Sequence, residues 1–108
     1  MEPGASDGTI EEKLGLQVIP MTPQIARSLG VPVDTKGVVI GTVDPNSDAA
    51  RKGLRRGDIV LSANYQAVNS VDDLLAQVKA ASAERREAIL LRVQRRTQPP
   101  AFFPIRLR

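Results

Sequence analysis

One stretch near the middle of the chain constrains the fold more than any other, because each small residue in it has a structural reason. Ser47 is placed to cap a short helix, and Ala49–Ala50 let that helix lie close against a strand. Gly53 supplies a left-handed residue that ends the helix, and Leu54 returns to the core. A Gly-Asp pair at 57–58 then turns the chain into a strand. The stretch therefore predicts a short helix between two strands.

The segments around this motif show the patterns of further elements. Thr22 and Pro23 begin a brief helix that Gly30 ends, and Ser70 caps the longest helix. Apolar, β-branched runs predict five short strands, over residues 14–20, 38–43, 59–63, 88–95 and 102–107. We expect the second of these strands to be buried on both faces. Strands and helices in mixed order predict a small α+β sheet that closes on itself.

Composition restricts the chemistry. The chain has 108 residues, enough for one domain, and it contains no His, no Cys and no Trp. A Ser-His-Asp triad, a Cys-His pair, a thiolate nucleophile and a zinc-finger ligand set are therefore all excluded. We expect a module that is not an enzyme and that carries no cofactor and no metal.

The two ends of the chain differ in character. Residues 1–12 are expected to form a flexible leader, and residues 13–108 one folded domain. The first eight residues are polar and acidic, unlike the basic and then apolar start of a signal peptide. No apolar run approaches the roughly 20 residues that cross a bilayer, so no transmembrane segment is predicted.

The spacing of Ala-Ala, Gly-Leu and Gly-Asp over residues 47–60 resembles the PDZ domain. The strand at 37–40 before it, and Asn64 and Val68 after it, extend the resemblance to about residues 14–108. More narrowly, the chain is similar to the PDZ domains of bacterial Do/HtrA-type serine proteases, and the turn over 64–68 resembles the second of two tandem domains. The implied α+β fold is a small, partly closed antiparallel β-sandwich or barrel of five to six strands. Two to three helices cap it, with the HtrA-type strand permutation.

The resemblance also implies a function. PDZ domains capture hydrophobic C-termini or unfolded, extended segments by adding them to a sheet as an extra strand. Such a module would serve substrate recognition in a periplasmic serine protease that acts in protein quality control and the stress response, and whose catalytic domain is absent from this chain. Other domains or subunits of that parent protease are the further partners expected.

The binding site implied by the resemblance begins at a short loop. Leu14, Gly15 and Leu16 match the loop whose successive backbone N–H groups hold the ligand carboxylate. The strand that pairs with the peptide would then be Leu16, Gln17, Val18 and Ile19. Lys13 would add positive charge beside the carboxylate, or would simply be a solvated surface charge.

The long helix is expected to form the far wall of the groove. Val71, Leu75 and Lys79 follow one another at four-residue spacing along one side, and we assign them to the groove. Val78 is assigned to the pocket floor and Leu74 to the core. The alternative is that every apolar residue of this helix is core.

The missing histidine bears on the ligand. PDZ domains that prefer Ser or Thr two residues before the ligand C-terminus generally have a His at the start of this helix, where the present chain has Val71. We therefore expect an apolar ligand residue at that position and an apolar C-terminal residue.

The charge is divided unevenly, with a net charge of −4 over residues 1–50 and +7 over residues 51–108. The basic half does not indicate a nucleic-acid partner, because the three aromatic residues form no evident stacking array and no long basic helix is predicted. The rival to peptide binding is an assembly module, with its groove unused and its arginines facing another domain, another subunit or lipid headgroups.

Overall fold

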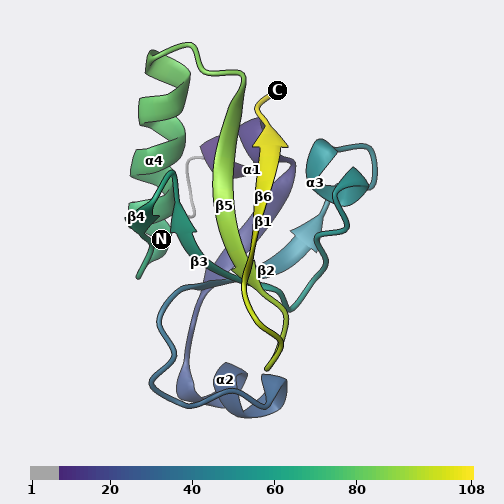
Figure 1. Cartoon of the computed structure of the whole chain (residues 1–108), viewed down its shortest axis with the longest axis vertical. Coiled ribbons are helices and arrows are strands. Elements are labelled where there is room, and N and C mark those ends of the chain that lie inside the picture. The colour runs from purple at the N-terminus through teal and green to yellow at the C-terminus, as the bar shows by residue number, and fades with distance from the viewer. Residues whose placement is uncertain (1–7) are drawn as a thin grey trace.

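In the computed structural model, which describes residues 8–108, six strands form one antiparallel sheet and four helices lie around it (Figure 1). The strand order is β1-β2-β3-β5-β6, and the short β4 pairs with β3. This architecture agrees with the α+β fold expected from the sequence. The strands are β1 (Leu16–Pro20), β2 (Val38–Val43), β3 (Ile59–Ala63), β4 (Gln66–Ala67), β5 (Ala88–Gln94) and β6 (Ala101–Arg106).

Three of the four helices begin at the caps that the sequence predicts. The side chains of Thr22, Ser47 and Ser70 each accept a hydrogen bond from the backbone N–H three residues later. The helices are α1 (Thr9–Leu14), α2 (Pro23–Leu29), α3 (Asp48–Arg51) and α4 (Val71–Ala83).

Helix α1 is the main departure from the sequence-based expectation. It begins at Thr9, inside the segment expected to be a leader, and the side chain of Ile10 is buried. The expected strand over 14–20 consequently starts later, at Leu16. Residues 1–7 of the expected leader lie outside the described residues.

Strand β2 departs from expectation in a smaller way. Val38, Val39 and Ile40 are buried, as expected for a strand covered on both faces, but Thr42 is exposed. The second half of β2, which pairs with the start of β1, therefore has one face exposed to solvent.

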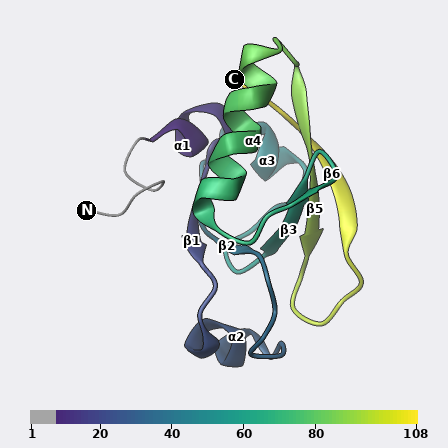
Figure 2. The ribbon, with the colours of Figure 1, turned by 90° about the vertical axis from the view of Figure 1, so that its left-hand side faces the viewer.

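One large hydrophobic core lies between the sheet and helices α1 and α4, which Figure 2 shows next to each other. Leu14 of α1 and Leu74 of α4 meet there with apolar residues of every strand except β4. A smaller cluster under α2 contains Ala26, Val31 and Ile59. Burial of these side chains is the main favourable term in folding.

The motif over 47–60 is tied to the sheet by an ion pair. The Asp58 carboxylate, 3% exposed, accepts hydrogen bonds of 3.0 Å from Nε and Nη2 of Arg95. It also accepts the backbone N–H of Arg55, and Arg95 donates in addition to the Gly53 carbonyl. Arg95 therefore serves the fold, although it counts among the basic residues of the second half of the chain.

Candidate functional site

The first strand, β1, has one free edge. Within residues 8–108 it pairs with β2 alone. Ile40, the partner of Val18 in this pairing, directs its N–H and C=O toward Asp58 and Gly57 on the side away from β1. Residues that face each other in an antiparallel pair both bond inward or both point outward. Val18 therefore presents its backbone N–H and C=O at the free edge.

The same alternation extends along β1. The pairing runs Leu16 with Val43 and Gln17 with Thr42, with an irregularity between Gln17 and Val18. The Leu16 backbone groups thus point to the same edge as those of Val18. Pro20 ends the strand without an N–H to offer. The free edge therefore presents donors at Leu16 and Val18.

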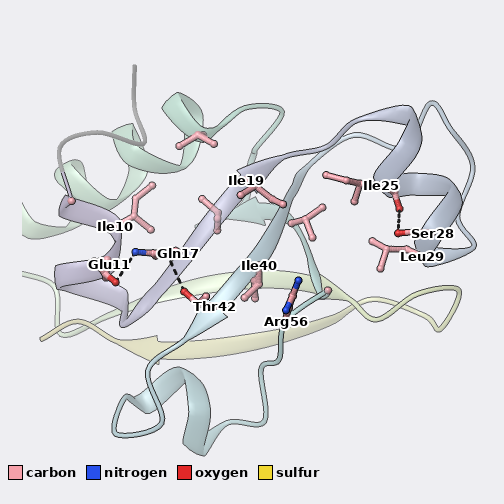
Figure 3. Close-up of a pocket in the computed structure, with 16 residues that line it drawn as sticks. Ile10, Glu11, Gln17, Ile19, Ile25, Ser28, Leu29, Ile40, Thr42 and Arg56 are labelled. Carbon is pink, nitrogen blue, oxygen red and sulfur yellow. Dashed lines mark hydrogen bonds between the residues drawn. The ribbon is translucent and has the colours of Figure 1, made fainter. Parts of the chain in front are cut away.

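A pocket of about 610 Å³ borders this edge. Figure 3 shows Ile10 and Glu11 of α1 at one end, Ile25, Ser28 and Leu29 of α2 at the other, and β1 running between them. Its remaining lining is largely apolar and comes mainly from β1, β2 and the first turn of α4. These residues are Gly8, Gln17, Val18, Ile19, Val39, Ile40, Gly41, Thr42, Arg56, Gly57 and Val71.

A chain of polar side chains crosses the outer face of β1. Gln17 Nε2 donates to Glu11 Oε2 at 2.8 Å, and Thr42 Oγ1 donates to Gln17 Oε1 at 3.2 Å (Figure 3). Ile19 lies on the same face and is 42% exposed. A ligand strand at the edge of β1 would therefore lie beside the apolar side chain of Ile19 and the polar side chain of Gln17.

The residues predicted on α4 lie in different environments. Val71 is 8% exposed and lines the pocket together with Val18. Leu75 is half-buried against the core and does not line the pocket. Val78, like Leu74, is fully buried in the core, and Lys79 is exposed. Val71 thus lines the pocket beside β1, whereas Val78, expected at the pocket floor, lies in the core.

The predicted carboxylate loop is the end of a helix. Leu14 closes α1, and Gly15 caps it in the left-handed region, with its N–H donated to the Glu11 carbonyl at 2.8 Å. Leu14 and Leu16 are each 1% exposed. Lys13 lies in the last turn of α1, where a positive charge favours the helix dipole. With α1 formed, the Gly15 N–H points into the helix and not toward a ligand.

Sequence reasoning missed the pocket residues on α1 and α2. Ile10 and Leu14 are four residues apart, the spacing of one helix face, and both are buried. That spacing is the signal that predicts α1. Ile25 and Leu29 of α2 have the same spacing, but only the fold brings them to the pocket beside β1.

An ion pair between Arg108 and Asp44 lies beside Gly15. Arg108 Nη1 donates to Asp44 Oδ2 at 2.9 Å. The backbone N–H of Asn46 and then this guanidinium hold the pKa of Asp44 below its usual value.

Over residues 8–108 no cluster of ligating side chains fits a metal ion, and no helix is long and apolar enough to cross a membrane.

Comparison with curated proteins finds relatives of one kind. Over 97 residues, 90% of the chain, it is 39% identical to a "Probable periplasmic serine endoprotease DegP-like" of Bartonella henselae. Over 65 residues, 60% of the chain, it is 45% identical to a protein with the same description in Brucella suis. The chain spans only 17% and 13% of the length of these relatives.

Solved structures show the same fold. The HtrA-type protease AlgW with a decapeptide matches with a TM-score of 0.68 and 33% identity, over 88% of this chain and 29% of that one. The HtrA3 PDZ domain bound to a phage-derived ligand matches with a TM-score of 0.71 and 24% identity, over 88% and 83%. The homologues' protease activity lies in a separate domain. The model of the PDZ domain matches residues 13–99, and the chain belongs to the PDZ domain family.

Proposed function

We propose that this domain binds an extended, apolar peptide as an added strand on the free edge of β1, next to α4. The ligand class is hydrophobic C-termini or unfolded segments, and the role is substrate recognition for a serine protease. The parent protein is proposed to be periplasmic, as its relatives are described to be.

The observation that carries the proposal is the open edge of β1 beside an apolar pocket. Leu16 and Val18 present backbone groups there, and a peptide strand supplies the complementary groups. Val71 and Ile19 offer contact to alternate ligand side chains. The AlgW structure, which matches this chain at 33% identity, is described as carrying a decapeptide.

The ligand is expected to be apolar where it contacts the helix. Val71 stands at the start of α4 and offers no hydrogen-bonding side chain to a ligand hydroxyl. A buried hydroxyl without a partner costs about 1–3 kcal/mol. A peptide library is therefore expected to enrich apolar residues at the C-terminus and two residues before it, and enrichment of Ser or Thr at the latter position would count against this ligand class.

The mode of binding is tested with two N-methylated versions of one apolar peptide. A strand at an edge directs every second amide toward the neighbouring strand. Methylation of the amides in that set is expected to weaken binding at least tenfold, because each lost hydrogen bond leaves a β1 carbonyl unpaired. Methylation of the alternate set is expected to leave the affinity nearly unchanged. Binding is followed by NMR shifts over residues 16–19 and 71–79, and equal loss with both peptides would contradict strand addition.

A second candidate function, docking to another domain or subunit, is favoured by one surface feature. Tyr65 is 77% exposed and Phe102 is 49% exposed, and their ring centroids are 5.7 Å apart. Arg92 is the cross-strand partner of Phe102 and is also exposed. Tyr, Phe and Arg are enriched at protein interfaces, so this aromatic pair is the place where an assembly contact is proposed.

A further inference from the structure

Helix α1 closes one end of the proposed groove. The side chain of Ile10 is 6% exposed and belongs to the same core cluster as Val18 and Val71. Helix α1 contacts both α4 and β1, and Figure 2 shows it beside the upper part of α4. A peptide bonded to Leu16 and Val18 would therefore meet α1 at the start of β1.

The helix also uses the backbone group that a ligand carboxylate requires. The Gly15 N–H donates to Glu11, and Leu14 is still part of the helix. Successive backbone N–H groups bind an anion only when they point to a common centre. The carboxylate loop expected from the sequence therefore exists only after the last turn of α1 opens.

The side chain of Arg108 fastens this last turn. Its Nε donates to the Glu12 carbonyl at 3.1 Å and its Nη2 to the Glu11 carbonyl at 3.3 Å. The backbone N–H of Arg108 donates to the Lys13 carbonyl. The third guanidinium nitrogen holds Asp44. Carbonyls at a helix end generally lack intrahelical partners. Arg108 supplies donors to the Glu12 and Lys13 carbonyls, and it adds a donor to the Glu11 carbonyl, which also accepts the Gly15 N–H.

By itself α1 is a weak helix. It has six residues, and Gly8 at its N-cap makes no side-chain capping bond. Isolated helices of this length are unstable in water, so α1 depends on the burial of Ile10 and Leu14 and on the contacts of Arg108.

We propose that α1 is a displaceable latch on the peptide groove, held closed by Arg108. In the closed state Ile10 occupies the end of the groove where the apolar C-terminal residue of a ligand would bind. Displacement of α1 exposes the Gly15 N–H for the ligand carboxylate. This inference rests on the proposed function, and it predicts that apparent affinity is lowered by the fraction of molecules that are closed.

The test compares Arg108→Ala with a matched control, Arg106→Ala. Arg106 is also exposed, and its hydrogen bond to Asp48 is made by its backbone N–H and not by its side chain. The probe is one synthetic heptapeptide with an apolar C-terminal residue and a free carboxylate. Arg108→Ala is expected to bind it about fivefold more tightly than the unsubstituted protein, and Arg106→Ala equally tightly. Amide hydrogen exchange at Gly15 in the free protein is expected to be faster in Arg108→Ala alone.

The outcomes separate the latch from the proposed function. Equal affinity and equal Gly15 exchange in Arg108→Ala, with peptide shifts at β1 in every protein, would overturn the latch and leave peptide binding standing. No shift at β1 in any protein would overturn both. Ile10→Ala serves as a second variant, because it weakens α1 at its other anchor. It is expected to bind more tightly as well, and weaker binding by a folded Ile10→Ala would contradict the latch.

Discussion

Gly15 is the residue whose identity matters most to the site. Its φ of +74° lies in the left-handed region, which glycine adopts freely. A Cβ built there would overlap Ser47, and it would lie 3.2 Å from Cζ of Arg108. Ser47 is buried and caps α3, so it cannot move aside without a loss elsewhere. Glycine at this position therefore lets the junction between α1 and β1 lie directly against the N-cap of α3.

Gly15→Ala is therefore expected to lower the free energy of unfolding by about 2–4 kcal/mol, from backbone strain and overpacking together. Gly30→Ala is the matched control, because Gly30 has a φ of +76° and no atom within 4 Å of its Cβ position. We expect it to cost only about 1 kcal/mol. Urea denaturation measures both, and equal losses would show that strain alone explains Gly15.

Residue patterns predicted the three helix caps correctly. Thr22, Ser47 and Ser70 precede apolar periodic segments, and local chemistry is enough to identify such caps. The role of Gly15 as the left-handed cap of α1 is not predicted from the sequence. What surrounds it depends on Arg108, which is distant in sequence, and no local pattern reports that contact.

Among the elements, α3 and β6 are joined through the carboxylate of Asp48. Asp48 Oδ2 accepts the backbone N–H of Arg106 at 2.9 Å and the ammonium of Lys52 at 3.1 Å. The first of these bonds is the largest cause of a lowered pKa for Asp48, and Lys52 adds to it. A carboxyl whose pKa is lower when folded stabilises the fold above its unfolded pKa, and that stabilisation is lost as pH falls through the folded pKa.

Asp48→Asn is expected to lower the free energy of unfolding by about 1 kcal/mol at pH 7, because it removes the charge that strengthens both bonds. As the pH falls below the usual pKa of an aspartate, the difference from the unsubstituted protein is expected to shrink, because Asp48 becomes protonated. Asp72→Asn is the control, because Asp72 is an exposed acid in the first turn of α4. We expect it to lower the free energy of unfolding by only a few tenths of a kcal/mol, roughly. Denaturation across pH measures this, and a difference independent of pH would contradict the assigned cause.

The element that sequence reasoning missed, α1, shows where such reasoning ends. Periodicity identifies long helices such as α4, whereas α1 has six residues and no side-chain cap. Its stability comes from the tertiary contacts of Ile10 and Arg108. Similarly, the sequence does not indicate that the pocket lined by Val71 also reaches Ile25 and Leu29 of α2.

At the scale of the whole molecule, the two edges of the sheet differ in how far their backbone groups are covered by hydrogen-bond partners. On β6, Asp48 bonds the Arg106 N–H, Lys52 donates to the Pro104 carbonyl at 2.7 Å, and Pro104 itself has no N–H. Such coverage protects an edge against pairing. On β1 the backbone groups of Leu16 and Val18 stay open beside an apolar pocket. The fold thus favours β1 for an incoming strand.

The exposed aromatic pair belongs to this scale too. Tyr65 has a φ of +68° in the two-residue turn between β3 and β4, a conformation that favours glycine. Tyr65→Gly is therefore expected to change stability by less than about 1 kcal/mol while removing the aromatic contact.

If the aromatic pair mediates assembly, Tyr65→Gly is expected to weaken self-association at least fivefold, as measured by sedimentation equilibrium. Val33→Ser is the control, because Val33 is 52% exposed in a loop away from the pair, and it should leave association unchanged. A protein that stays monomeric at millimolar concentration would contradict assembly of this chain with itself.

The most direct test of strand addition is amide hydrogen exchange at both sheet edges, with and without a saturating apolar peptide. We expect exchange to slow at least tenfold at Leu16 and Val18, because the peptide carbonyls accept their N–H groups. Exchange at Phe102, on the other edge, should stay the same. Unchanged exchange at Leu16 and Val18 in the peptide-bound protein would contradict binding at β1.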